Sequence, residues 1–322
     1  MSHVNIIDKG MEPCVRAFLE KINAVGHPLN RMSIDDARKA LNRVQSVKVD
    51  KVPSDVIDTS IPGVYGSVSV RIVRPAGVCD LLPAVIYFHG GGWVIGDKNT
   101  HDKLMRDIAN STCAAVVFVD FTRSPEARFP FALEESYSVL EYIWKNGAAL
   151  RIDSSRIAVA GDSAGGNMST VLSMMAMDRQ GPPISFQCLL YPVTDSDFNT
   201  QSYTELAEGY FLTQDAMMWF WDQYLPDIRS RKQTYASPLR APIDQLKGLP
   251  PALILTAEFD VLRDEGEAYA HKLMDAGVQV TAIRYLGTIH DFVVLNSLAN
   301  SIATRSAIDL ACDMLRRAFS KG

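Results

Sequence analysis

A serine between closely spaced glycines is the clearest chemical signal in this chain of 322 residues. Residues 161–166 read GDSAGG and fit the pattern G-x-S-x-G, a sharp strand-to-helix turn that presents a serine hydroxyl above a sheet. The flanking glycines are needed because a side chain there would collide with the strand and the helix. The pattern alone also fits an ordinary glycine-rich loop. However, an apolar run at 157–160 and a helical pattern at 167–177 supply the expected neighbours, so Ser163 is the candidate nucleophile.

A serine hydroxyl at its ordinary pKa is a poor nucleophile and needs a base, which in turn needs an acid to orient it. In a strand–turn–helix site of this kind the chain order is serine, acid, histidine. Only His271 and His290 follow Ser163 in the sequence. His271 falls in a helical pattern at 263–276, where a solvated or packed role is more common. His290 follows an extended segment at 280–286, in the loop after it, and is the candidate general base.

Several aspartates lie between the serine and this histidine, and the strand pattern selects one of them. Asp260 comes directly after an apolar segment that begins at 252–255, so it is expected at the end of a buried strand. That strand is next in order to the one before His290. Glu258, still on the strand, and Asp264, expected to cap the following helix, are the competing carboxylates. Asp260 is the candidate acid.

Three consecutive glycines end another apolar segment. Residues 89–93 read HGGGW after a strand predicted at 83–88, and such a run lets backbone N–H groups approach a ligand closely. Those N–H groups can hold the oxyanion of a tetrahedral intermediate, and the expected donors are Gly90, Gly91, Gly92 and Ala164. A phosphate-binding loop is the alternative, but neither Lys-Ser nor Lys-Thr follows the glycines. We expect His89 to hold this loop and not to act as a base.

The elements that must position these groups alternate along the chain. Strand-like segments separated by helical patterns lie at 67–74, 83–88, 114–119, 157–160, 186–191, 252–255 and 280–286. Strands joined by helix-length crossovers, such as the pattern at 132–144, predict a mainly parallel sheet with helices on both faces, an α/β fold. We expect the sheet to start at residue 67. Two helices precede it, at 15–25 and at 34–44, the second capped by Ser33 and Asp36.

One interval interrupts this alternation. Residues 195–240 show no clear strand and are rich in aromatic side chains, so they are expected to form an insertion over the C-terminal strand ends, where ligands bind in open α/β sheets. Aromatic residues at helical spacing more often pack a helix onto its neighbours, so only some of them are expected to touch a ligand. The candidate pocket residues are Trp93, Tyr191, Tyr210, Phe211, Leu212, Trp219 and Trp221.

Composition argues against several function classes. The net charge is −5 and the 32 Lys and Arg form no block, so neither nucleic acid nor a stable membrane association is expected. Residues 1–21 lack the apolar core of a signal peptide, and five widely spaced cysteines without a C-x-x-C pair suit a reducing compartment. These features predict a cytoplasmic protein with a small-molecule partner and no metal or cofactor. The sequence leaves a homodimer open.

The motifs together resemble those of the hormone-sensitive lipase family of α/β-hydrolases. The likeness rests on HGGGW, GDSAGG, the DVLRDEG segment that starts at Asp260 and a late histidine, and it covers nearly the whole chain beyond about Lys51. It implies a carboxylesterase that acts through an acyl-enzyme intermediate, with the roles already assigned to Ser163, Asp260 and His290. It also implies an α/β-hydrolase domain over residues 51–322, with a cap built from residues 1–50 and an insertion at about 196–235.

Three positions depart from the usual pattern of that family. Val261 replaces a frequent proline after the acid, Asp291 replaces a frequent glycine after the base, and residues 120–126 read DFTRSPE where DYRLAPE is common. None of them removes a catalytic group. Asp291 is expected to raise the pKa of the imidazole of His290.

Other functions on the same fold remain as alternatives. A non-catalytic ligand receptor would lack the base, yet His290 is present. A lipase for long acyl chains should expose a broad apolar lid, and no feature selects a peptidase. Acidic residues interrupt the insertion instead, at Asp195, Asp197, Glu205, Glu208, Asp215 and Asp222. Esters of short to medium acyl chains are therefore the predicted substrates.

Overall fold

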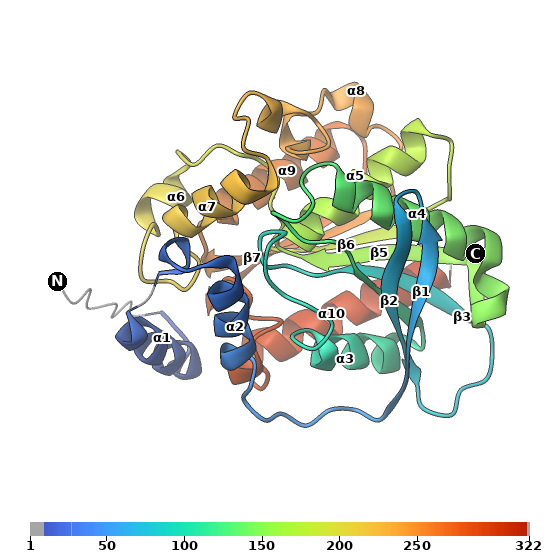
Figure 1. Ribbon diagram of the computed structural model, residues 1–322, viewed down its shortest axis with the longest axis horizontal. Helices are drawn as coiled ribbons and strands as arrows, with labels where there is room; N and C mark the ends of the chain where they lie inside the picture. Colours follow the sequence, from blue (N-terminus) through green and yellow to red (C-terminus); the bar gives the residue numbers. More distant parts are fainter. Residues whose placement is uncertain (1–9, 27, 321–322) are drawn as a thin grey trace.

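A single mixed sheet organises the chain in a computed structural model that describes residues 10–26 and 28–320 (Figure 1). Over these residues the sheet has eight strands in the order β1-β2-β4-β3-β5-β6-β7-β8. They are β1 (Ser54–Gly63), β2 (Gly66–Pro75), β3 (Leu82–Phe88), β4 (Ala115–Asp120), β5 (Ile152–Asp162), β6 (Phe186–Leu190), β7 (Ala252–Phe259) and β8 (Val280–Ile289). Strands β3 to β8 pair in parallel, whereas β2 pairs antiparallel with both β1 and β4. The predicted α/β fold is confirmed.

Helices cover both faces of the sheet. Helices α4, α5 and α9 lie on one face, and α3 and α10 lie on the other (Figure 1). Apolar side chains of these helices pack against the strands. The α-helices are α1 (Pro13–Val25), α2 (Ile34–Val44), α3 (Asp102–Thr112), α4 (Phe131–Asn146), α5 (Ala164–Asp178), α6 (Gln201–Glu205), α7 (Gln214–Tyr224), α8 (Ile243–Leu246), α9 (Arg263–Asp275) and α10 (Ile302–Phe319). Short 3-10 turns lie at η1 (Leu29–Arg31), η2 (Gly147–Leu150), η3 (Ser230–Lys232), η4 (Pro238–Arg240) and η5 (Asn296–Leu298).

The central strands are apolar at every position because both of their faces are covered. All seven residues of β3 are buried. Val85 and Tyr87 join the cluster beside α3 and α10, whereas Ile86 and Phe88 join the cluster beside α4 and α5. Alternate side chains of a strand point to opposite faces, so a strand buried on both sides reads as a continuous apolar run. This pattern made the parallel strands visible in the sequence.

The expected start of the sheet at residue 67 is wrong, because β1 precedes it. This strand lies at the edge of the sheet, and most of its side chains are exposed, including Ile57 at 53%. An exposed edge strand needs no apolar run, so its sequence lacks the signal that identified the other strands. A second difference is that β8 extends to Ile289, so His290 follows the strand directly and does not end a loop.

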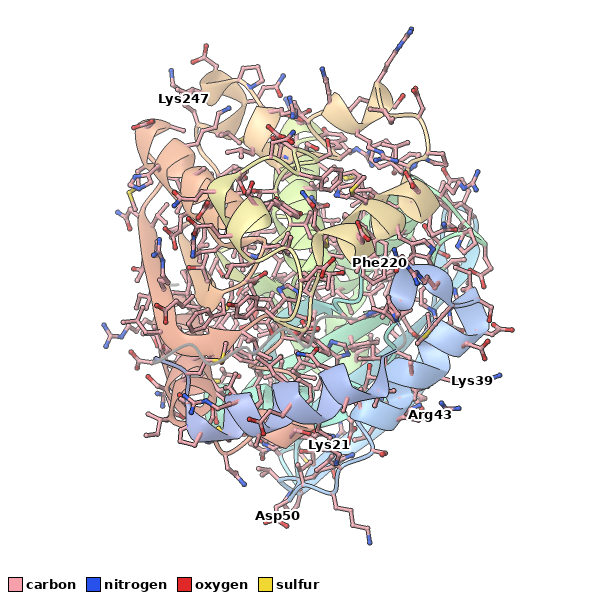
Figure 2. All side chains as sticks on the ribbon, turned by 90° about the vertical axis from the view of Figure 1, so that its left-hand side faces the viewer. Lys21, Lys39, Arg43, Asp50, Phe220 and Lys247 are labelled. Carbon is pink, nitrogen blue, oxygen red and sulfur yellow. The ribbon has the colours of Figure 1, made fainter. Side chains whose placement is uncertain are left out.

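The N-terminal helices and the insertion after β6 lie side by side at one end of the molecule (Figure 2). Helix α2 begins as predicted, because the hydroxyl of its N-cap Ser33 accepts a hydrogen bond from the backbone N–H of Asp36. Asn23 of α1 donates to the carbonyl of Gly209 over 3.0 Å. This last contact joins residues 186 positions apart and ties the N-terminal helices to the insertion. No helix in the described part of the chain is long and apolar enough to cross a membrane.

Candidate active site

Ser163 occupies a strained turn between β5 and α5. Its φ is 53°, a left-handed conformation that side chains other than glycine seldom adopt. The turn is tight enough that a Cβ added at Gly161 would strike the backbone of Gly165, and one added at Gly165 would strike the carbonyl of Phe88. The two glycines therefore let the turn fit between β3 and α5, as the sequence pattern predicts. The turn holds the hydroxyl at the carboxyl end of the sheet.

The three predicted catalytic side chains meet at this point. His290 Nε2 lies 3.0 Å from Ser163 Oγ, and His290 Nδ1 lies 2.7 Å from Asp260 Oδ2. All three residues are at most 3% exposed. The tautomer that satisfies both contacts has Nδ1–H donating to Asp260 and Nε2 accepting from the serine hydroxyl. This is the geometry of a nucleophile, a general base and an orienting acid.

The competing carboxylates near Asp260 are engaged elsewhere. Glu258 accepts a hydrogen bond from the backbone N–H of Gly287 over 2.7 Å. Asp264 accepts from the backbone N–H of Ser202 over 2.7 Å and pairs with Arg263. Asp264 lies in the first turn of α9 and does not cap it, so that expectation is wrong; the residue ties α9 to the insertion instead.

Two carboxylates set the charge environment of His290. Burial alone disfavours the imidazolium, but the charges of Asp260 and Asp291 outweigh burial and raise the pKa of His290 above its ordinary value. Asp291 Oδ1 lies 3.4 Å from His290 Nε2. The raised pKa agrees with the direction expected from the sequence. A raised pKa makes the imidazole a stronger base, but it also keeps the imidazole protonated up to a higher pH.

The glycine run after β3 has a conformation that only glycine adopts easily. Gly91 and Gly92 have φ values of 94° and 59°, and a Cβ on Gly92 would strike the ring of Phe220. The Gly90 N–H already donates to Asp162 Oδ2 over 3.0 Å. The N–H group of Gly90 is therefore already hydrogen-bonded. The expected oxyanion donors that remain are Gly91, Gly92 and Ala164.

A buried polar network that the sequence analysis missed supports this loop. Asp162 Oδ1 accepts from the hydroxyl of Tyr87 over 2.7 Å, and Asp162 Oδ2 lies 3.3 Å from His101 Nε2. Burial raises the pKa of Asp162, but the charge of His101 and these hydrogen bonds outweigh burial. The pKa of Asp162 therefore lies below its ordinary value. In the sequence, the one sign of this network was the aspartate at the first x of G-x-S-x-G. Its partners Tyr87 and His101 lie more than 60 positions away.

His89 holds the loop, as predicted from the sequence. Its ring stacks on Phe121 with centroids 4.4 Å apart, and its Nδ1 lies 2.7 Å from the carbonyl oxygen of Gly90. Burial lowers the pKa of His89 to about 3, so the ring is neutral and donates through Nδ1–H.

The candidate pocket residues occupy two different environments. The ring of Tyr191 meets His290 edge-on at 4.9 Å, and Tyr210 stacks on Phe259 one residue before the acid. The others pack among the cap and the loop behind the glycines. Trp93 and Trp221 are fully buried against Tyr224. Phe211 contacts Phe18 of α1, and the adjacent Leu212 is buried. Trp219 is half-buried and lies against Phe220.

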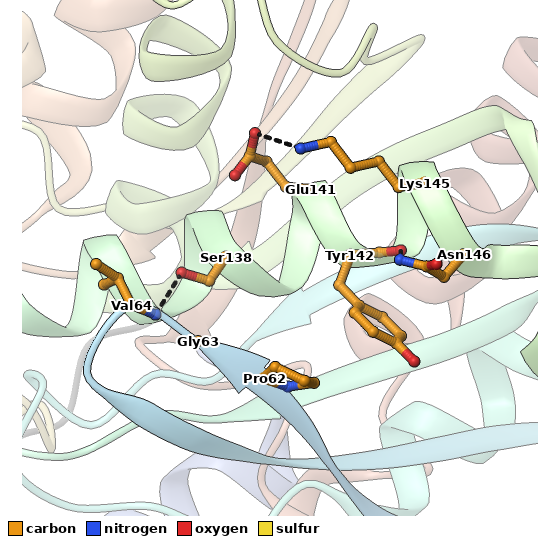
Figure 3. Close-up of a pocket in the computed structure, with 8 residues that line it drawn as sticks. All are labelled: Pro62, Gly63, Val64, Ser138, Glu141, Tyr142, Lys145 and Asn146. Atoms are coloured by element: carbon orange, nitrogen blue, oxygen red, sulfur yellow. Dashed lines mark hydrogen bonds and ion pairs between the residues drawn. The ribbon is translucent and has the colours of Figure 1, made fainter.

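A separate surface hollow has no link to this chemistry. Figure 3 shows it between the turn after β1 and helix α4, with Val64 N–H donating to Ser138 and Lys145 paired with Glu141. Its volume is about 330 Å³, and its lining residues are Pro62, Gly63, Val64, Ser138, Glu141, Tyr142, Lys145 and Asn146. None of the three elements that carry the catalytic groups contributes to it.

Known proteins share both the fold and nearly the full length of this chain. A family model described as alpha/beta hydrolase fold matches residues 85–294. The crystal structure of a thermostable esterase from Pseudomonas putida has a TM-score of 0.95 and 47% identity, over 97% of this chain and 98% of that chain. Carboxylesterase NlhH of Mycobacterium tuberculosis is 36% identical over 324 residues, 99% of each chain. With the geometry of Ser163, His290 and Asp260, these likenesses show that the chain is a serine carboxylesterase and belongs to the hormone-sensitive lipase family of α/β-hydrolases.

Proposed function

We propose that this carboxylesterase hydrolyses small-molecule esters with acyl chains of about four to eight carbons, bound in an enclosed site under the cap. The observation that carries the proposal is a group of aromatic rings from the cap that pack beside the catalytic acid. Tyr210 of the insertion stacks on Phe259 with ring centroids 5.5 Å apart, and the adjacent Phe211 meets Phe18 of α1 at 5.4 Å. Both parts of the cap therefore contribute apolar rings close to the end of β7.

The outer side of the insertion argues for small soluble esters. Its acidic residues Glu205, Glu208, Asp215 and Asp222 are exposed. A lid that settles on an oil surface needs a broad apolar face, and scattered carboxylates oppose that contact. Met218, 44% exposed, is the large apolar side chain that α7 leaves to solvent. The same features support an enzyme without a stable membrane association. We further propose that it is cytoplasmic, because its five cysteines are widely spaced and form no C-x-x-C pair.

The reaction follows from the positions of the catalytic atoms. His290 Nε2 takes the proton of the Ser163 hydroxyl while Oγ attacks the ester carbonyl carbon, and the imidazolium formed is stabilised by Asp260. In this proposal the N–H groups of Gly91, Gly92 and Ala164 hold the negative oxygen of the tetrahedral intermediate. His290 then gives its proton to the leaving alcohol. Water, deprotonated by the same imidazole, attacks the acyl-enzyme, and the imidazolium returns its proton to Ser163 Oγ as the acid is released.

A series of p-nitrophenyl esters with increasing acyl length tests the substrate class. We expect kcat/KM to be highest between about four and eight carbons and to fall for chains of twelve or more, because an enclosed pocket of ordinary ligand size excludes them. Phe211→Ala should move the preferred length, whereas Met218→Ala on the exposed face of α7 should not. Faster hydrolysis of emulsified long-chain triglycerides than of dissolved esters would contradict the proposal and indicate a lipase.

A further inference from the structure

Asp291, the residue after the catalytic base, combines a left-handed backbone with a buried carboxylate oxygen that accepts no hydrogen bond from the described residues. Its φ is 61°, in the left-handed region that glycine adopts at no steric cost. Its side chain is 17% exposed overall, but Oδ1 is buried and accepts no hydrogen bond from the described residues. His290 Nε2 lies 3.4 Å from this oxygen. The free oxygen of Asp291 therefore faces the nitrogen through which the serine proton moves.

A structural role does not account for an aspartate at this position. Left-handed backbone is strained for a residue with a Cβ, and a buried carboxylate oxygen without a donor destabilises the folded protein. Glycine would remove both penalties and still permit the turn. Destabilising features of this kind concentrate at functional sites, where the surrounding structure holds them in place.

The other charged groups around His290 have partners of their own. Asp162, at the end of β5, accepts from Gly90 and Tyr87 and faces His101, which precedes α3. Tyr191, after β6, is neutral because burial raises the pKa of its hydroxyl well above the ordinary value. Asp260, after β7, accepts from Leu262 N–H and from His290 Nδ1. Asp291 remains as the carboxylate with an oxygen free to meet a charge on Nε2.

We propose that Asp291 is a second carboxylate of the proton-transfer site, which stabilises the imidazolium on its Nε2 side and sets the pH at which the enzyme becomes active. The proposal rests on the catalytic role of His290 given above and not on the acyl length. When Ser163 gives its proton to Nε2, the new positive charge lies between Asp260 and Asp291. Burial raises the pKa of the Asp291 carboxyl to about 6, so the carboxylate is ionised at neutral and alkaline pH.

The sign of the effect follows from which form of His290 works. The neutral imidazole is the base, and a carboxylate 3.4 Å away favours the imidazolium. Removing that charge should therefore lower the pKa of His290 and extend activity to lower pH. At this distance a unit charge shifts a pKa by about one unit under the screening of bulk water and by about three and a half units at an effective dielectric constant of ~20.

The test is the pH dependence of kcat/KM for one soluble ester in the wild type and in Asp291→Asn and Asp291→Gly. Both variants should move the acidic limb down by about one to three and a half pH units, and the alkaline plateau should fall by about tenfold because imidazolium stabilisation is lost. Asp291→Gly should also raise Tm, because it relieves the backbone strain. The downfield NMR signal of His290 Nδ1–H should titrate with the same shifted pKa.

Asp244→Asn serves as the matched control, because it removes an exposed carboxylate from α8 and should leave the profile unchanged. Variants that fold and hydrolyse the ester with the wild-type acidic limb would overturn the proposal. A wild-type enzyme without esterase activity would instead count against the catalytic assignment, so the two failures are distinguishable.

Discussion

Two buried aspartate–histidine pairs lie within the same end of the molecule, and only one of them is placed to catalyse. Asp260 and His290 are 2.7 Å apart, and Asp162 and His101 are 3.3 Å apart. Both pairs are buried and both use a carboxylate that follows or ends a parallel strand. What differs is the group that faces the second ring nitrogen.

In the catalytic pair the second nitrogen faces a hydroxyl that can give up its proton. His290 Nε2 accepts from Ser163, so the ring can be neutral and act as a base. His101 Nδ1 lies 2.8 Å from the hydroxyl of Thr100, whose own hydrogen goes to the carbonyl of Asp97. Both nitrogens of His101 must then donate, and the pKa of His101 is raised above its ordinary value because Asp162 outweighs the effect of burial. The same residue pair makes a base in one place and a donor to a buried carboxylate in the other.

The largest effect is expected when the ring of His290 is removed. We expect His290→Ala to lower kcat by about 10⁵ to 10⁶, because the nucleophile loses its base and the triad works as a unit. Steady-state kinetics with a soluble ester, together with circular dichroism to verify folding, provide the measurement. Residual activity within a hundredfold of the wild type would mean that another group acts as the base.

Neutralising the catalytic acid should have a smaller effect. In Asp260→Asn the amide no longer fixes the correct tautomer of His290 or stabilises the imidazolium, and kcat should fall by about 10⁴. Glu258→Gln is the matched control, since Glu258 lies two residues earlier and accepts from Gly287. A larger loss in Glu258→Gln than in Asp260→Asn would show that the acid has been misassigned.

The acid of the second pair should affect the reaction only through the loop that it holds. Asp162→Asn weakens the hydrogen bond from Gly90 and removes the charge that faces His101. We expect kcat to fall by about 10² to 10³, the effect of disturbing oxyanion donors. The acidic limb should move down less than in Asp291→Asn, because the charge of Asp162 raises the pKa of His290 less than that of Asp291. A loss as large as that of Asp260→Asn would remove the distinction between the pairs.

The smallest effect is expected at the histidine of the second pair. His101→Gln keeps a neutral donor near Asp162 but leaves the buried carboxylate without its cation. We expect the free energy of unfolding to fall by about 1–3 kcal/mol and kcat to stay within tenfold of the wild type. Urea unfolding and steady-state kinetics measure the two quantities. An inactive but stable variant would give His101 a catalytic role.

The comparison of the two aspartate–histidine pairs also explains which site residues could be predicted from the sequence. Ser163 was predicted from a local pattern, and Asp260 because it directly follows an apolar segment. His290 was predicted from the chain order serine, acid, histidine and from the extended segment shortly before it. The Asp162 network was missed because Tyr87, His101 and Asp162 belong to separate elements with no shared motif. Only the pairing of β3 with β5 brings Tyr87 near the end of β5.

Two further features could not be predicted from the sequence, because one depends on surface exposure and the other on a single backbone contact. The edge strand β1 was missed because its side chains face solvent. The role of Gly90 changed because its N–H points to Asp162, and a glycine in a run of three carries no sign of which N–H is occupied. The glycines at Gly91 and Gly92 were nevertheless expected, since the run itself indicates close backbone approach.

Covalent labelling tests the central assignment most directly. The intact enzyme is treated with an organophosphate such as paraoxon, digested and analysed by mass spectrometry, with Ser163→Ala treated in parallel. We predict one phosphorylated peptide containing Ser163, loss of esterase activity in proportion to labelling, and no adduct in the variant. An adduct on any other serine that accounts for the lost activity would contradict the assignment of Ser163 as the nucleophile.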